Sequence, residues 1–126
     1  MFKRLIPNLM VEDVNKTIKF YQETLGCFEL VRTFPEKGRF DWAMMRCEGA
    51  DIMFQSRESL SNKIPQFKQM KMGGSMVIYI ETEGVKELYS WLTGKAEIVK
   101  ELHQTSWGRK EFFIKDCNGY TIVFAQ

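Results

Sequence analysis

Two stretches of the chain repeat the same order of apolar and polar positions, and each surrounds a short polar turn. The first spans residues 39–55, RFDWAMMRCEGADIMFQ, and the second lies within residues 106–126, SWGRKEFFIKDCNGYTIVFAQ. A shift of about 70 residues aligns six pairs: Arg39 with Arg109, Trp42 with Phe112, Cys47 with Cys117, Gly49 with Gly119, Ile52 with Ile122 and Phe54 with Phe124. Each copy predicts a β-hairpin in which glycine takes the turn position with positive φ. A repeated hairpin predicts two halves of one fold.

The first half contains the signals of one helix among four strands. Residues 2–11 are apolar around Pro7, which predicts a strand that either lies at a sheet edge or places its missing N–H where no partner needs it. Asp13 is typical of a helix N-cap, and Gly26 is typical of a helix end. The apolar stripe between them consists of Val14, Ile18, Tyr21 and Leu25. Further strands are expected at residues 28–34, 40–47 and 51–55.

The second half has the same order of elements. A strand is expected at residues 75–82, followed by a helix that Gly94 ends and by strands at residues 95–102, 109–115 and 120–125. The apolar stripe of this helix consists of Val85, Leu88, Tyr89 and Leu92. We therefore expect a single domain of two β-α-β-β-β modules, residues 1–55 and 74–126. Residues 56–73 are polar and basic and predict a long connector, either a lid or a mobile segment.

Composition limits the classes of protein. A chain of 126 residues with 44% hydrophobic residues is large enough to fold without staples, and a net charge of +2 does not favour a nucleic-acid partner. Cys27, Cys47 and Cys117 are an odd number and lack metal-type spacing. No apolar run is long enough for a membrane span or a secretory signal, so we expect a reducing cytoplasm and no membrane partner.

Three segments, taken in order, resemble the vicinal oxygen chelate superfamily and, within it, the glyoxalase and bleomycin-resistance group. They are IPNLMVEDVNKTIKFYQETLG, GVKELYSWL and WGRKEFFIKDCNGYTIVF, and the resemblance covers nearly the whole chain. It implies an α+β fold in which two βαβββ modules form curved mixed β-sheets around a cleft. It also implies a homodimer, with residues 2–11 or the first helix at the interface.

Enzymes of the superfamily hold a divalent metal with four inward His, Glu or Gln side chains. The resemblance places these positions at Ile6, Met53, Val77 and Val123. Isoleucine and valine carry no donor atom and methionine offers only a soft thioether, so we expect no metal and no other cofactor. The single histidine, His103, is expected to be a surface or capping residue, and no catalytic residue is assigned.

The apolar positions suggest a ligand-binding cleft instead. Bleomycin-resistance proteins carry a Trp-Gly-Arg element similar to Trp107-Gly108-Arg109, which implies that Trp107 stacks on a ligand. The alternative is that Trp107 covers the end of the sheet. The candidate ligand-binding residues are Trp107, Trp42, Phe40, Met44, Met53, Phe54, Tyr79, Arg109 and Phe112.

Three functions follow from these expectations. The first is metal-independent binding or sequestration of a small aromatic or amphipathic molecule, as in antibiotic resistance. The second is a glyoxalase- or dioxygenase-type enzyme with an atypical site, and the third is an interaction module with a vestigial cleft. A cationic drug would favour an acidic cleft, whereas the chain is slightly basic. The candidates for a local acidic patch are Glu81, Glu83, Asp41 and Asp51.

Overall fold

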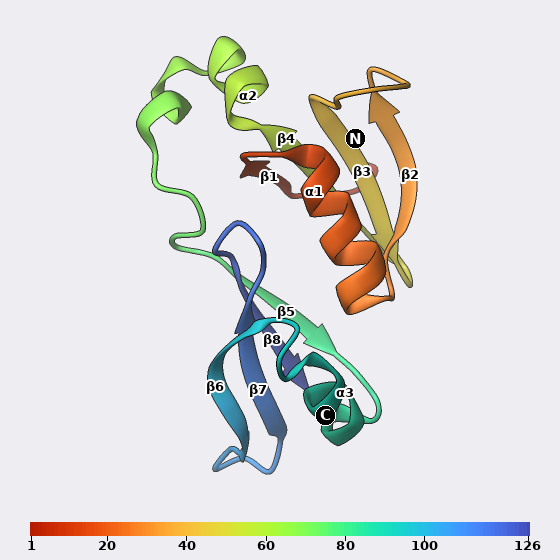
Figure 1. Ribbon diagram of the computed structural model, residues 1–126, viewed down its shortest axis with the longest axis vertical. Coiled ribbons are helices and arrows are strands. Elements are labelled where there is room, and N and C mark those ends of the chain that lie inside the picture. Colours follow the sequence, from red (N-terminus) through yellow and green to blue (C-terminus); the bar gives the residue numbers. More distant parts are fainter. The chain divides into compact units, whose positions relative to one another are not determined.

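The computed structural model describes residues 1–126, which fold into two compact units, Met1–Lys71 and Met72–Gln126 (Figure 1). Each unit contains a four-stranded mixed sheet, in the order β1-β4-β3-β2 in the first unit and β5-β8-β7-β6 in the second. In each sheet the first strand of the unit pairs in parallel with the last, and the other pairs are antiparallel. The predicted α+β fold of two βαβββ modules is confirmed.

The bounds of the elements agree with most of the sequence predictions. The first unit consists of β1 (Asn8–Val11), α1 (Val14–Lys19), the π-helix η1 (Phe20–Leu25), β2 (Glu29–Phe34), β3 (Trp42–Cys47), β4 (Ala50–Ser56), α2 (Arg57–Lys63) and the 3-10 helix η2 (Pro65–Gln69). The second unit consists of β5 (Val77–Glu81), α3 (Val85–Leu92), β6 (Glu97–Gln104), β7 (Lys110–Lys115) and β8 (Thr121–Ala125).

The helix in the first unit begins and ends where its capping residues predict. The Asp13 carboxylate accepts a hydrogen bond from the Lys16 N–H at 3.0 Å, and Gly26 is left-handed with φ 89°. The predicted stripe is buried as far as Tyr21. Leu25 is only half-buried because the chain has by then passed into the wider π-helix, where the α-helical spacing no longer holds one face.

Aromatic packing shows which face of each sheet the helix covers. Tyr21 of η1 lies 4.8 Å from the Phe54 ring of β4, measured between ring centroids. In the second unit Phe112 of β7 stacks on Phe124 at 5.2 Å and meets Tyr89 of α3 at 5.1 Å. Because side chains alternate along a strand, the neighbours of these residues point away from the helix, to what we call the open face of the sheet.

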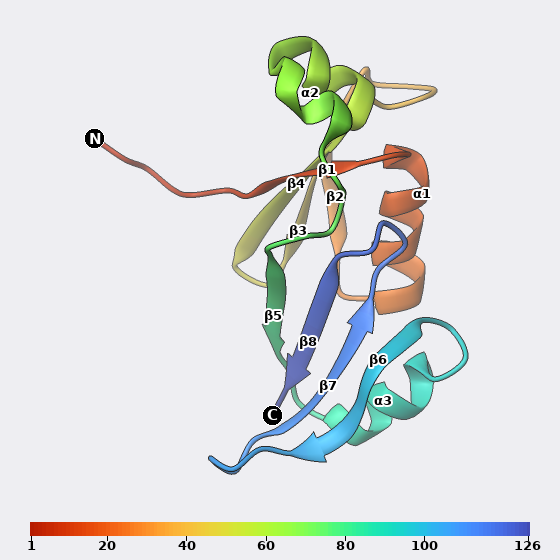
Figure 2. The same cartoon turned by 90° about the vertical axis from the view of Figure 1, so that its left-hand side faces the viewer.

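The predicted first strand is shorter than expected. Only Asn8–Val11 pairs with β4, and Figure 2 shows the preceding residues leaving β1 as an extended arm. Pro7 has no N–H to give to a ladder, although its carbonyl oxygen accepts a hydrogen bond from the Met53 N–H at 2.8 Å. Phe2 and Leu5 in this arm are exposed.

The predicted connector is folded and contains helices that the sequence analysis missed. Ser56 caps α2, because its hydroxyl oxygen accepts a hydrogen bond from the Ser59 N–H at 3.1 Å. The Arg57 guanidinium then binds Glu12 through Nε at 2.7 Å and the Met70 carbonyl oxygen through a terminal nitrogen at 2.8 Å. This connector lies in the first unit as far as Lys71.

The two hairpins differ by one residue at their turns. In the first, Cys47 pairs with Ala50, so two residues form the turn, and Glu48 rather than Gly49 has the positive φ, 54°. In the second, the Asp116 N–H donates to the Tyr120 carbonyl oxygen, so three residues lie between them, and Gly119 has φ 92°. The alignment of the two halves by a shift of 70 residues therefore matches β4 with β8 correctly. It matches β3 with β7 one residue out of register.

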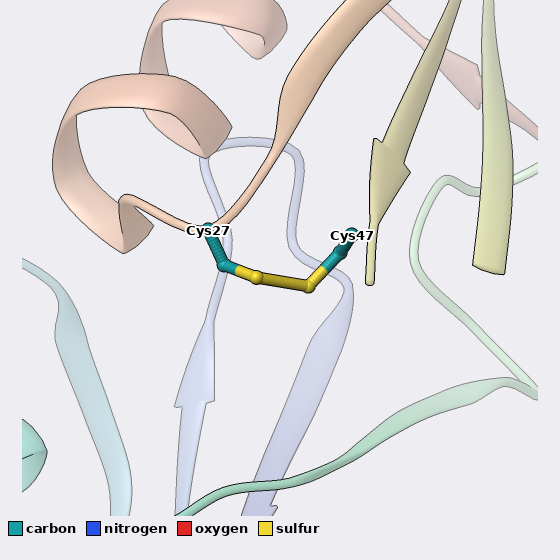
Figure 3. Close-up of a disulfide and its surroundings, with 2 residues drawn as sticks. All are labelled: Cys27 and Cys47. Carbon is teal, nitrogen blue, oxygen red and sulfur yellow. A yellow bond between two sulfur atoms is a disulfide. The ribbon is translucent and has the colours of Figure 1, made fainter. Parts of the chain in front are cut away.

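Cys27 and Cys47 form a disulfide, which joins the segment after η1 to the end of β3 (Figure 3). Their Cα atoms are 5.6 Å apart, within the usual range for a disulfide. Cys117 is exposed and takes no part in a disulfide. No helix of the chain has both the length and the apolar character needed to cross a bilayer.

Candidate ligand-binding pocket

The open face of the first sheet combines aromatic, thioether and amide side chains. Trp42 is the register partner of Gln55, and Met44 is the partner of Met53 on the adjacent strands β3 and β4. Asn8 on β1 is the parallel partner of Met53. Because register partners share a face, these five side chains lie together on the side away from α1.

A pocket of about 430 Å³ opens over this face, which is within the range of small-molecule sites. Its lining consists of Asn8, Phe34, Asp41, Trp42, Met53, Gln55, Ser59 and Lys63. Met53 provides the apolar floor, while Trp42 and Phe34 are partners on neighbouring strands and offer two aromatic rings. Ser59 and Lys63 come from α2, so the connector forms one wall.

A chain of hydrogen bonds fixes the polar side chains of the pocket. The Asn8 amide nitrogen donates to the Gln55 carbonyl oxygen at 2.9 Å, and the Gln55 amide nitrogen donates to the Ser59 hydroxyl at 2.9 Å. Asn8 therefore keeps its own carbonyl oxygen as an acceptor at the open face. The arrangement holds β1, β4 and α2 in a fixed relation around the pocket.

Two opposite charges stand at the pocket without partners. The Asp41 carboxylate and the Lys63 ammonium take part in no ion pair or hydrogen bond. The backbone of Asp41 is nevertheless fixed, because its N–H donates to the Phe34 carbonyl oxygen and its carbonyl accepts from the Ser56 N–H, both at 2.8 Å. The pocket thus offers a charged hydrogen-bond acceptor, the Asp41 carboxylate, and a charged donor, the Lys63 ammonium, beside its aromatic rings.

The predicted site residues of the first unit separate into three groups. Trp42 and Met53 line the pocket, and Met44 is buried beside Met53 on the same face. Phe40 lies in the loop before β3, where its N–H donates to the Asn15 side chain at 2.9 Å, and it does not line the pocket. Phe54 is fully buried against the helix, because it follows Met53 and therefore points to the opposite face.

Phe112 is a second correction, and it follows from the one-residue difference between the hairpins. Phe112 pairs with Phe124 as Ala43 pairs with Phe54, so Ala43 and not Trp42 is its equivalent. A slip of one residue reverses the face of a strand. Phe112 is accordingly buried under α3 and is removed from the candidate site.

The remaining predicted residues lie in the second unit. The Tyr79 hydroxyl donates to Glu111 at 3.3 Å on the open face of the second sheet. Arg109 pairs with Glu81 at 3.7 Å, and its Nε is buried without a hydrogen-bond partner. Trp107, in the turn between β6 and β7, is 72% exposed and so does not cover the end of its sheet.

The four acidic residues are divided between the two units. Asp41 and Asp51 belong to the first unit, and Glu81 and Glu83 belong to the second. Asp51 is bound by Arg46 at 2.7 Å and also by Arg4. A hydrogen bond from Arg46, together with the positive charges of Arg46 and Arg4, lowers the pKa of Asp51 below its ordinary value. Its charge is therefore neutralised by neighbours.

Five pocket residues were not predicted from the sequence, namely Asn8, Phe34, Gln55, Ser59 and Lys63, and Asp41 was expected only as part of an acidic patch. The polar residues Asn8 and Gln55 within otherwise apolar strands were the available signal, because a polar side chain on a strand usually marks a face that is not core. Ser59 and Lys63 could not be placed while α2 was taken as a connector.

The four positions that the resemblance assigns to metal ligands do not fit a divalent metal. Met53 and Val123 lie on the open faces of their sheets, and so does Val77, the register partner of Thr121. None of these side chains, nor Ile6, carries a nitrogen or oxygen donor. No group of three or more His, Cys, Asp or Glu that could hold a metal occurs in the structure.

Comparison with known proteins bears on the family and the fold. The family model described as Glyoxalase/Bleomycin resistance protein/Dioxygenase superfamily matches residues 5–124. No curated protein matches the chain.

Three solved structures are similar over nearly the whole chain. TioX from Micromonospora sp. ML1 has 19% identity and a TM-score of 0.76, covering 99% of this chain and 98% of its own. A virulence protein from Salmonella typhimurium has 22% identity and a TM-score of 0.71, covering 100% and 98%. A glyoxalase/bleomycin resistance protein/dioxygenase superfamily member from Sphaerobacter thermophilus has 21% identity and a TM-score of 0.76, covering 98% and 97%. Likeness at these identities concerns the fold.

Proposed function

Because the chain belongs to the Glyoxalase/Bleomycin resistance protein/Dioxygenase superfamily but lacks metal ligands at the corresponding positions, we propose that it binds a small aromatic or amphipathic molecule without a metal ion. The observation that carries this proposal is the pocket on the open face of the first sheet, whose lining includes Trp42, Phe34 and Met53. Bleomycin-resistance-like sequestration of such a molecule is the corresponding biological role.

The pocket suits recognition of a ring with polar substituents. Trp42 and Phe34 present π faces to a flat ring, and the flexible Met53 side chain adapts to its outline. The fixed amides of Asn8 and Gln55 then orient the polar groups of the ligand. Asp41 and Lys63 favour a molecule that carries charge at its edge, which is why the class includes amphipathic ligands.

Binding without turnover is the simplest chemistry for these side chains. The pocket lining contains neither histidine nor cysteine, and its hydroxyl group, on Ser59, accepts a hydrogen bond from Gln55 rather than being paired with a base. Nucleophilic catalysis requires a nucleophile in contact with such a base. These observations support a binding protein over the alternative of an atypical enzyme.

The proposal is tested by titrating the protein with indole and with 1-anilinonaphthalene-8-sulfonate in the presence of EDTA. We expect saturable binding of at least one probe, weakened by about 1–3 kcal/mol in Trp42→Ala because one stacking ring is lost. Trp91→Ala is the matched control, since Trp91 does not line the pocket.

Two results would overturn the proposal. One is binding that Trp42→Ala leaves unchanged, because the ligand would then lie elsewhere. The other is a stoichiometric metal ion, found by elemental analysis of protein purified without added metal, together with binding that EDTA abolishes. The second result would favour the atypical enzyme.

A further inference from the structure

Glu111 of β7 is a buried carboxylate on the open face of the second sheet. It pairs with Ala125 of β8 and with His103 of β6, in the row that corresponds to Gln55, Trp42 and Phe34 in the first sheet. Glu111 is therefore the equivalent of Trp42, yet it is only 6% exposed. A charged residue stands where the first unit has the aromatic wall of its pocket.

The charge of Glu111 is poorly compensated within the chain. The one hydrogen bond to its carboxylate comes from the Tyr79 hydroxyl at 3.3 Å, which is long for a bond between oxygen atoms. Arg109 lies two residues earlier on the same face, but its guanidinium pairs with Glu81 at 3.7 Å instead. Burying a carboxylate without a cation is costly, so a site with this composition favours a cationic ligand.

The surroundings of Glu111 are aromatic. The His103 ring, on its register partner, packs edge-to-face on Phe113 with 5.7 Å between centroids. The Lys100 ammonium nitrogen stands 5.6 Å from the Phe113 centroid, so this ring already receives a positive charge from the chain itself. Tyr79 is half exposed beside the carboxylate. Aromatic faces around a carboxylate are the chemistry by which proteins recognise organic ammonium groups.

We propose that Glu111, Tyr79 and Phe113 form a binding site for the ammonium group of a small organic cation. Glu111 opposes the charge of the ligand, and the rings of Tyr79 and Phe113 contact its alkyl groups. Lys100 occupies the Phe113 ring in the free protein and competes with the ligand. The site shares no residue with the pocket of the first unit, so it stands independently of the proposed function.

The test is a titration with benzyltrimethylammonium chloride, followed by NMR of the aromatic side chains at constant ionic strength, with neutral benzyl alcohol for comparison. We expect saturable shifts at Phe113 and Tyr79 with the cation alone. Glu111→Gln should weaken binding by at least about fivefold, because the buried carboxylate that opposes the charge of the ligand is lost. Glu97→Gln, on β6 opposite Lys115, is the matched control and should leave binding unchanged.

Lys100→Ala provides a second test. If Glu111 had only a structural role, this substitution would not change binding of the cation. Removing the competing ammonium should strengthen binding about twofold to fivefold, the scale of an exposed cation–π contact. Equal binding of benzyl alcohol, or unchanged binding in a folded Glu111→Gln protein, would overturn the proposal. If Glu111→Gln does not fold, Lys100→Ala decides, and unchanged or weaker binding there overturns it as well.

Discussion

The exposure of a single side chain, Trp107, distinguishes between two roles that the sequence did not separate. Trp107 was equally compatible with a stacking residue and with a cover at the end of the sheet. At 72% exposure it contributes little to any core, and the Thr105–Arg109 hydrogen bonds hold the surrounding turn without its side chain. These two roles of Trp107 differ in how far the side chain is buried. Alternation along a strand does not predict the burial of a residue in a turn.

We therefore expect Trp107→Ala to change the free energy of unfolding by no more than about 0.5 kcal/mol. If Trp107 stacks on the ligand, the same variant should bind it more weakly by about 1–3 kcal/mol. Thermal unfolding and ligand titration of one protein measure both quantities. Trp91→Ala is the control, because Trp91 is also exposed and contacts Lys95, which follows the end of its helix. A large loss of stability with unchanged affinity would restore the structural role.

At the scale of elements, the sequence predicts what is periodic and local. The helices α1 and α3 follow from apolar stripes with a cap or a glycine at their ends, and both hairpins follow from their turns. The position of Trp42 on a face with Met44 also follows from alternation. Phe112 was misplaced because the second turn has one additional residue, which no ungapped alignment detects and which reverses a face.

The helix α2 was missed for a different physical reason. Leu60 is its one buried apolar residue, so no stripe marks it in the sequence. Its stability comes from the Ser56 cap and from Arg57, which joins Glu12 to the Met70 carbonyl oxygen after η2. The contact between Arg57 and Glu12 joins residues far apart in the chain, so it depends on tertiary structure. Because α2 was not predicted, the two pocket residues on it, Ser59 and Lys63, were not predicted either.

The N-terminal arm gives a prediction on pH. Asp51 on β4 holds Arg4 of the arm and Arg46 of β3, and these arginines lower its pKa below the ordinary value of about 3.9. A carboxyl group whose pKa is lower in the folded state contributes stability above its unfolded pKa and loses it as pH falls through its folded pKa. The free energy of unfolding should therefore decrease below about pH 4.

Denaturant unfolding between pH 7 and pH 2 measures this effect in the wild type and in Asp51→Asn. The variant should be less stable at pH 7 and should lose less stability on acidification than the wild type. Asp41→Asn is the control, because the Asp41 carboxylate has no ion-pair partner to lose. Parallel pH profiles for Asp51→Asn and the wild type would show that the Asp51 ion pairs do not contribute.

At the scale of the whole molecule, the Cys27–Cys47 disulfide bears on the expectation, drawn from composition, that the protein lies in a reducing cytoplasm. Cys27 and Cys47 are separated by 20 residues, and closing a loop of that length stabilises a chain by about 3 kcal/mol in the chain-entropy model. Reduction should lower the unfolding temperature in the wild type and in Cys117→Ser, but not in Cys27→Ser. Three free thiols in denatured, unreduced protein would contradict the bond.

A cytoplasmic location stays a prediction, since disulfides persist mainly in oxidising compartments.

Assembly is the last prediction. Each sheet has two edge strands, and the arm before β1 exposes Phe2 and Leu5 almost completely. Open edges and exposed apolar side chains favour pairing with another chain, and a two-fold contact uses each residue twice. We propose a homodimer in which residues 2–11 or α1 contribute to the interface. Burying one Phe or Leu contributes about 1.5–3 kcal/mol, so Phe2→Ser with Leu5→Ser should weaken dimerisation by more than about tenfold if the arm is buried.

Sedimentation velocity across micromolar concentrations measures the dimer, with Val99→Ser on β6 as a control for an exposed apolar side chain outside the arm. Three outcomes separate the possibilities. A wild-type monomer at these concentrations would contradict the homodimer itself. A wild-type dimer that the double variant leaves intact would exclude the arm and leave α1 as the contact. A dimer lost in the double variant but kept in Val99→Ser would assign the arm to the interface, because the two exposed apolar side chains of the arm are the ones that the double variant removes.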